Sequence, residues 1–202
     1  MKKNILKILS IGLLTFNMLT INTQAITKEE SKQTIQMFTN NLPQILKDKI
    51  EGVSIKIQNN EEFNNEGYEY GIYENDGTAG YRGVSRHREN EIIRINCDTE
   101  KYIRGYGYDT FVHECFHSLD SYFSSSKRIW IIKYSDTDKF KALYNKYKDN
   151  KEIGEYYLTS SREFFAQCGM LYLNYPYFLK TEYPKVYTYM DNLIKNYKTK
   201  YI

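Results

Sequence analysis

The segment 110–120, TFVHECFHSLD, constrains this chain more than any other stretch of its sequence. It contains two of the three histidines, His113 and His117, and Glu114 directly follows the first of them. On an α-helix, at about 100° per residue, His113 and His117 lie one turn apart on the same face, where two imidazoles can bind one metal ion. This H-E-x-x-H spacing predicts a metal-binding helix, and zinc is the metal that most often uses it.

Glu114 has a different position on this predicted helix. It lies about 100° round from His113, so it is not placed to bind the metal together with the two imidazoles. A carboxylate there can instead accept the proton of an attacking water, whose pKa a bound zinc lowers to about 7. The alternative interpretation is a buried, metal-free helix that carries two histidines by chance, because several side chains of 110–120 are apolar.

Residues 1–25 are typical of an export signal. They contain three lysines and no acidic residue, with an apolar run from Ile5 to about Leu19. That run is shorter than about 20 residues and is interrupted by polar side chains, which disfavours a transmembrane helix. Ala25 fits the small position before a cleavage site. We therefore expect a secreted chain, residues 26–202, without a membrane anchor.

The charge balance excludes one class of partner. Without the three lysines of the signal, the chain has 25 basic and 25 acidic residues. A nucleic-acid-binding protein needs a clustered basic face, so we expect no nucleic-acid partner.

Residues 26–202 are enough for one domain with its own core and too few for two. We expect this domain to be a monomer.

The three cysteines, Cys97, Cys115 and Cys168, allow at most one internal disulfide, and the sequence assigns none. Cys115 lies about 200° round the predicted helix from His113. We therefore expect it on the opposite, packed face and not among the metal ligands.

The first half of the mature chain predicts helices followed by a small sheet. Residues 27–50 have helical periodicity, and Pro43 divides them into two helices. Alternating apolar and polar residues over 53–58 predict a strand. Residues 59–80 are acidic and rich in asparagine and glycine, and their tyrosines predict a short strand or a loop.

Residues 80–96 predict a hairpin whose second strand is buried. Its first strand, 80–86, is expected to be an exposed edge. Such an edge beside a metal site can pair with an extended peptide. The alternative is an ordinary hairpin without a ligand, and these residues leave both interpretations open.

The second half of the chain is expected to be mainly helical. Residues 128–134 predict a strand or a packed loop. Further helices are predicted over 135–148, from Ser160 or Ser161, and from Pro184, which suits the first position of a helix.

Catalytic zinc normally has three protein ligands, so a third must come from elsewhere. Phe123 stands where a third histidine six residues after His117 would lie, and His87 lies in a basic turn typical of a solvated loop. The best carboxylate is Glu163, at the start of an amphipathic helix. However, Ser160 and Glu163 also form a capping box, in which Glu163 would only bind a backbone amide. Chemistry alone leaves both roles open.

Two motifs together resemble one protease family. HECFHSLDSY is similar to the H-E-F-G-H-x-x-D-x-Y stretch of the anthrax lethal factor protease domain, and YYLTSSREFFAQ resembles that family's Y-x-x-T-x-x-x-E-F-F-A-E. The similarity extends to EYPKVYTYMDNLI and, more loosely, to LPQILKDKIEGVSIKI and the 80–96 hairpin. It covers most of the mature chain. The family includes the secreted clostridial Pro-Pro endopeptidases, which this chain resembles in having a signal peptide and one domain.

The resemblance implies a fold and an activity. The expected fold is a single α+β, zincin-like metallopeptidase domain. In it a small twisted sheet with an exposed edge strand packs on an active-site helix, and the C-terminal half is helical. The expected activity is that of a secreted zinc endopeptidase acting on extended protein or peptide substrates, with proline-directed cleavage as the narrower expectation. The alternative is a catalytically weak secreted binding module, or toxin-like module, with the same fold.

Carried over residue by residue, the resemblance implies that His113, His117 and Glu163 bind one Zn²⁺ per chain. Glu114 would be the catalytic base and Tyr156 the residue that stabilises the oxyanion. The adjacent Tyr157 is the alternative for that last role, because chemistry alone does not fix which of the two tyrosines matches the motif.

Three further positions bear on this implied site. Asp120 would orient an imidazole, or else face solvent. The chain departs from the family at Phe116, where the family has glycine, and at Gln167, where it has glutamate. The first departure implies different packing around the metal-binding helix, and the second implies a changed metal affinity.

Overall fold

The computed structural model describes residues 27–69, 79–82, 92–96, 107–120 and 133–197. The predicted export signal, the turn of the 80–96 hairpin and residues 128–132 lie outside these ranges, as do His87 and Cys97. In chain order the elements are α1 (Lys28–Asn40), α2 (Gln44–Ile50), β1 (Ser54–Gln58), α3 (Asn60–Glu69), β2 (Ala79–Arg82), β3 (Ile92–Asn96), α4 (Gly107–Asp120), the 3-10 turn η3 (Tyr134–Asp136), α5 (Asp138–Tyr147), the 3-10 turns η4 (Lys151–Ile153) and η5 (Tyr156–Leu158), α6 (Ser161–Asn174), α7 (Pro176–Glu182) and α8 (Pro184–Lys195).

The sheet has the strand order β1-β3-β2. The central strand β3 pairs in parallel with β1, where Ile55 lies opposite Ile93, and antiparallel with β2, where Tyr81 lies opposite the same residue. All five residues of β3 are buried, as a central strand covered on both faces requires. The predicted strand at 53–58 and the buried second strand of the hairpin are confirmed. Among the described strands, β2 lies at an edge of the sheet, as expected.

The N-terminal helices follow the predicted signals. Thr27 and Glu30 form the capping box of α1, with 3.2 Å between the backbone nitrogen of Glu30 and Oγ1 of Thr27. Pro43 separates α1 from α2 and occupies the position before the first residue of α2. These helices and the sheet confirm an α+β architecture.

Helix α3 corrects the expectation for the acidic stretch after β1. Asn59 and Glu62 form a second capping box, because Oδ1 of Asn59 accepts from the backbone nitrogen of Glu62 at 2.8 Å, and the Glu62 carboxylate accepts from the backbone nitrogen of Asn59 at 3.3 Å. Phe63 is buried and packs against the guanidinium group of Arg94 in β3. Tyr68 therefore lies in a helix and not in the predicted strand or loop.

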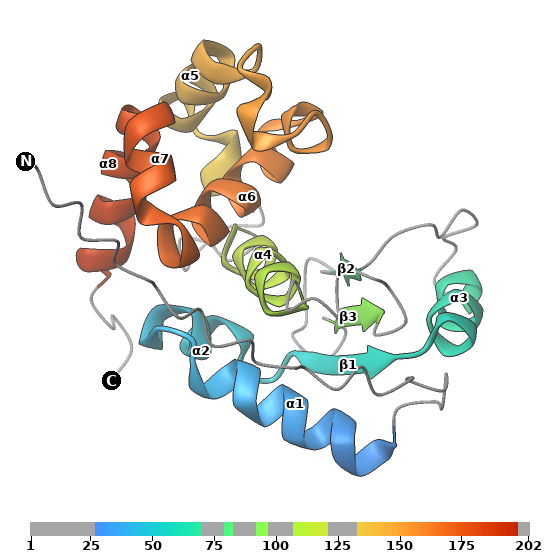
Figure 1. Cartoon of the computed structure of the whole chain (residues 1–202). Helices are drawn as coiled ribbons and strands as arrows, with labels where there is room; N and C mark the ends of the chain where they lie inside the picture. Colours follow the sequence, from blue (N-terminus) through green and yellow to red (C-terminus); the bar gives the residue numbers. More distant parts are fainter. Residues whose placement is uncertain (1–26, 70–78, 83–91, 97–106, 121–132, 198–202) are drawn as a thin grey trace, which may run out of the picture.

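Helix α4 lies at the centre of the molecule (Figure 1). The strands β2 and β3 and the helix α2 contact it on one side, and α6 packs along it on the other. Every residue from Phe111 to Asp120 is buried. The helix that carries the H-E-x-x-H motif is thus held on several sides, and α6 is its principal partner.

The helical C-terminal half differs from expectation in two places. The helix predicted from Ser135 begins at Asp138, because the side chain of Thr137 caps it by accepting from the backbone nitrogen of Phe140. Helix α7 was not predicted, although it begins with a proline as α8 does. The predictions of α6 and of Pro184 as the first residue of the last helix are confirmed.

Two tyrosines, one buried and one half-buried, anchor the segment between α5 and α6. The hydroxyl of Tyr183 accepts from the backbone nitrogen of Ile153 at 3.2 Å and donates to the carbonyl oxygen of Asn150 at 2.9 Å. The hydroxyl of Tyr144 donates to the carbonyl oxygen of Leu158 at 2.7 Å. These bonds fix η4 and η5, the segment that carries Tyr156.

In the ranges given above, no helix has both the length and the apolar character needed to cross a membrane.

Candidate metal centre

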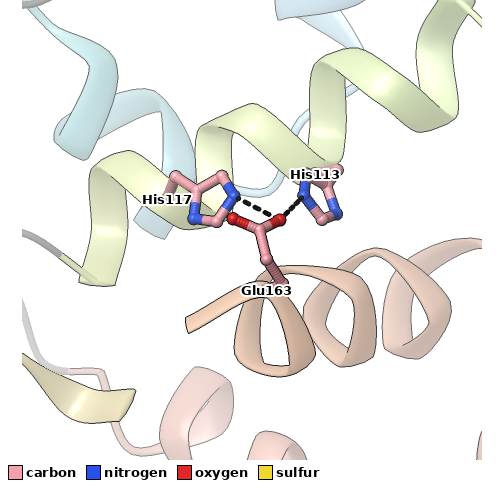
Figure 2. A group of neighbouring side chains, drawn as sticks. All are labelled: His113, His117 and Glu163. Atoms are coloured by element: carbon pink, nitrogen blue, oxygen red, sulfur yellow. Dashed lines mark hydrogen bonds and ion pairs between the residues drawn. The ribbon is translucent and has the colours of Figure 1, made fainter. Parts of the chain in front are cut away.

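His113 and His117 lie side by side on α4 (Figure 2). Their residues are 6% and 4% exposed, and the ring centroids are 4.7 Å apart at an interplanar angle of 86°. The spacing of four residues places both rings on one face of the helix. Both Nε2 atoms point away from α4 and toward the first turn of α6.

Glu163 enters this space from α6. Its backbone nitrogen donates to Oγ of Ser160 at 3.1 Å, so Ser160 is the N-cap of the helix. The carboxylate points to the imidazoles, and its Oε2 lies 3.2 Å from Nε2 of His113 and 3.2 Å from Nε2 of His117. Ser160 caps α6 as the sequence allowed, but the side chain of Glu163 reaches the histidines.

The three donor atoms have the spacing of ligands that share one ion. Two ligands about 2.0–2.1 Å from a tetrahedral zinc ion lie about 3.4 Å apart. The observed separations of 3.2 Å between Oε2 and each Nε2 are close to this value. In the part of the chain that the structure describes, these three residues form the one cluster of histidine, cysteine and acidic side chains with metal-ligand spacing. Two imidazole nitrogens and one carboxylate oxygen fit catalytic zinc, which keeps a further position for water.

The same contacts determine the charge of Glu163. Burial raises the pKa of its carboxyl group, but hydrogen bonds and electrostatic attraction from His113 and His117 outweigh burial and hold that pKa well below its ordinary value. Glu163 is therefore ionised at neutral pH, which is the form that binds a metal ion.

Gln167 lies one turn after Glu163 and contacts the far side of the His113 ring. Its Oε1 is 3.2 Å from Nδ1 of His113, and the pair is buried. A neutral imidazole that donates Nδ1–H to this amide presents the lone pair of Nε2 to the space beside Glu163. The sequence identified Gln167 only as a departure from a family motif. The structure places it where it orients His113.

We expect Gln167→Leu to lower zinc affinity about 10–100-fold, because Nδ1–H of His113 would lose the acceptor that fixes its orientation. Gln167→Glu keeps an acceptor at this position and is expected to bind zinc at least as tightly as the parent. Competition with a chromophoric chelator measures both affinities. An unchanged affinity in the leucine variant would contradict the orienting role.

Glu114 is buried next to the histidine pair and is 6% exposed. Burial raises the pKa of its carboxyl group, and the nearby His117 and His113 partly oppose the rise. Among the described residues, none provides a hydrogen-bond partner for its Oε2 atom. An unsatisfied buried carboxylate oxygen beside three converging ligand atoms is suited to bind a water molecule.

The two candidate tyrosines occupy different positions. Tyr156 is largely exposed, with 64% of its surface accessible, but partial burial and the charges of Glu163 and Glu114 raise the pKa of its phenol to about 12. Tyr157 packs its ring against the ring of His113, with centroids 5.4 Å apart. Of the two phenols, that of Tyr156 is thus the one whose pKa is raised to about 12 beside the carboxylate of the cluster.

Asp120 is fully buried and does not face solvent. Its Oδ1 accepts from the backbone nitrogen of Ser135 at 2.8 Å, and its Oδ2 accepts from the hydroxyl of Ser135 at 2.7 Å. Burial raises the pKa of Asp120, whereas these hydrogen bonds and the charge of His117 lower it. The hydrogen bonds of Asp120 described here join the end of α4 to η3 and do not orient an imidazole.

Cys115 and Cys168 are both free thiols in the core, and burial raises the pKa of each thiol well above its ordinary value. Neither belongs to the cluster around Glu163, as expected for Cys115.

Neither protein-family models nor curated proteins give a match to this sequence. Any functional assignment therefore depends on the residues of the site and their geometry.

Proposed function

We propose that this chain is a secreted zinc-dependent endopeptidase of the lethal-factor-like zincin type. The observation that carries the proposal is the position of one Glu163 oxygen, 3.2 Å from Nε2 of both His113 and His117, beside the buried carboxyl group of Glu114. His113, His117 and Glu163 would hold one Zn²⁺ per chain. A bound zinc ion would act as a Lewis acid at the scissile carbonyl group and would lower the pKa of water to about 7.

Glu114 is the proposed proton carrier. It accepts one proton from the attacking water as the new carbon–oxygen bond forms, and gives that proton to the leaving nitrogen as the carbon–nitrogen bond breaks. The other proton of the water stays on the new carboxyl group, so the products are one carboxylic acid and one amine, and Glu114 ends the cycle ionised. The raised pKa of its carboxyl group supports this role, because a carboxyl group with a pKa closer to neutrality holds the proton more readily between the two steps.

Tyr156 is the proposed donor to the carbonyl oxygen. With a pKa of about 12, its phenol remains protonated at neutral pH. It can donate one hydrogen bond to the negative charge that develops on the oxygen in the transition state. The anchoring of η5 through Leu158 supports this role, since it restricts where the phenol can lie.

The proposed substrate is an extended peptide that pairs with the edge strand of the sheet. Strand β2 (Ala79–Arg82) is an edge in the part of the sheet that is described, and it contacts α4, the helix of the catalytic motif. Main-chain hydrogen bonds to such an edge provide affinity with little dependence on sequence. Proline-directed cleavage is the narrower proposal. It rests on the resemblance to the Pro-Pro endopeptidases alone.

The other parts of the proposal follow from the sequence. Residues 1–25 would direct export and be removed, and residues 26–202 would act outside the cell as a monomer. The balance of 25 basic and 25 acidic residues in the mature part supports a protein or peptide substrate over a nucleic acid.

A peptide-library cleavage assay tests the activity. Residues 26–202 are expected to cleave peptides in the presence of zinc, to lose activity with a metal chelator, and to regain it when zinc is added back. Mass spectrometry of the products identifies the cleaved bond and tests the preference for proline. Cleavage that is insensitive to the chelator would contradict the zinc mechanism. Stoichiometric zinc binding without cleavage of any peptide would support a binding module instead.

A further inference from the structure

Helix α6 contains a glycine, Gly169, in its interior, where glycine is less favourable than alanine. The reason for it lies on α4. A Cβ atom built on Gly169 would be 2.5 Å from Cε1 of Phe116 and closer still to Cγ and Cδ1 of the same ring. Carbon atoms pack at about 3.5–4.0 Å. The ring of Phe116 therefore fills the space that a side chain at position 169 would need.

The ring of Phe116 has little freedom to move away. Phe116 is fully buried, and its ring lies edge-on to that of Phe165, with centroids 6.2 Å apart at 69°. The clash would include Cγ, the ring atom nearest the backbone, so a small rotation of the ring does not relieve it. An added Cβ would instead have to push α6 away from α4.

The same two helices carry the proposed zinc ligands. Phe116 immediately precedes His117 on α4, and at about 100° per residue Gly169 lies about 120° round α6 from Glu163. One flank of the pair α4 and α6 thus carries the contact between Phe116 and Gly169. The other flank carries the ligand cluster. The separation of the helices at the first flank determines how far the Glu163 carboxylate is from the two imidazoles at the second.

We infer that Phe116 and Gly169 are positioning residues for this cluster. The absence of a side chain at position 169 lets α6 approach α4 closely enough for one carboxylate oxygen to reach both Nε2 atoms, and the ring of Phe116 sets the limit of that approach. The inference rests on the proposed zinc site. It does not depend on peptide cleavage.

The first test is Gly169→Ala in the chain of residues 26–202. Its zinc affinity, measured by chelator competition on folded protein, is expected to fall about tenfold or more, comparable to the loss of a group that orients a ligand. The matched control is Val186→Ala, which removes buried methyl groups from α8, a helix that carries no ligand. The control is expected to lower the melting temperature and to leave zinc affinity within about twofold of the parent.

The second test is the double variant Phe116→Ala/Gly169→Ala, in which all three clashing ring atoms are absent. It is expected to recover zinc affinity to within about threefold of the parent, while its melting temperature stays low because a cavity remains. If zinc affinity recovers while the melting temperature stays low, the two residues act by positioning the cluster and not by stabilising the fold in general. If Gly169→Ala does not fold, the double variant decides alone. An affinity that stays about tenfold weak in the double variant, or a Gly169→Ala protein that binds zinc like the parent, would overturn the inference.

The parent protein distinguishes this inference from the proposed activity. A parent that binds one zinc ion but cleaves no peptide leaves the comparison of affinities intact and contradicts only the activity. A parent that binds no zinc overturns the proposed site and the inference with it.

Discussion

Replacement of Glu114 by glutamine is expected to leave one zinc ion bound per chain and to lower the rate of peptide cleavage by a factor of about 10²–10⁴. The amide has nearly the shape of the carboxylate, so the buried site is preserved, but it cannot accept a proton from water. Elemental analysis measures the zinc, and the initial rate on a library-derived peptide measures the activity. The burial of Glu114 and its unsatisfied Oε2 atom are the features on which this expectation depends.

The matched control is Glu61→Gln. It makes the same chemical change in the first turn of α3, where Glu61 is exposed. The control is expected to cleave at the rate of the parent. A Glu114→Gln protein that cleaves as fast as the control would show that another group accepts the proton, and the proposed mechanism would be wrong.

His113→Ala is expected to abolish stoichiometric zinc binding. The variant lacks one of three donor atoms and leaves the carboxylate of Glu163 with a single imidazole partner. Its loss of affinity should exceed the roughly 10–100-fold loss that follows removal of an orienting group such as Gln167. Zinc at about 100 times its Kd should stabilise the folded parent by about 2.7 kcal/mol, and the variant should gain almost none of this. Elemental analysis after dialysis and thermal unfolding with and without zinc provide the two measurements.

His87→Ala is the matched control, because it removes the third histidine of the chain. It is expected to keep one equivalent of zinc and the full zinc-dependent stabilisation. If His87→Ala loses zinc, or if His113→Ala retains one equivalent, the ligand set proposed above is wrong.

The placement of the two histidines on helix α4 was predictable because its geometry is local. A spacing of four residues places His113 and His117 on one face of any α-helix, whatever packs against it. The role of Glu163 was less certain, since the sequence allowed it to be a capping residue or a ligand. In the structure the backbone nitrogen of Glu163 donates to Oγ of Ser160, which caps the helix, and the carboxylate of Glu163 reaches the imidazoles.

Helices α3 and α7 were missed although both carry a start signal. Asn59 and Glu62 have the spacing of a capping box, and Pro176 occupies the first turn of α7. Composition argued against a helix at both places, because α3 is acidic and rich in asparagine and the sequence around α7 is rich in tyrosine. At both places the local capping chemistry was a better guide than composition.

The contacts of Gln167 and Gly169 could not be predicted from sequence. Both depend on how α6 crosses α4, and no periodicity within either helix specifies that crossing. Phe116 was recognisable as unusual, but the residue that accommodates it lies more than fifty positions later in the chain. Side chains that orient or space proposed metal ligands across two helices are tertiary features, and a structure was needed to find them.

The pair of hydrogen bonds between Asp120 and Ser135 also bears on how the chain can change. These bonds, of 2.8 and 2.7 Å, bring the end of α4 and the start of the C-terminal half to the same buried point. Insertions or deletions within 121–132 therefore begin and end at fixed anchors. A change of length between these anchors does not require α4 or α6 to shift. Divergence in chain length is accordingly expected to collect at this position and to leave the cluster of His113, His117 and Glu163 unchanged.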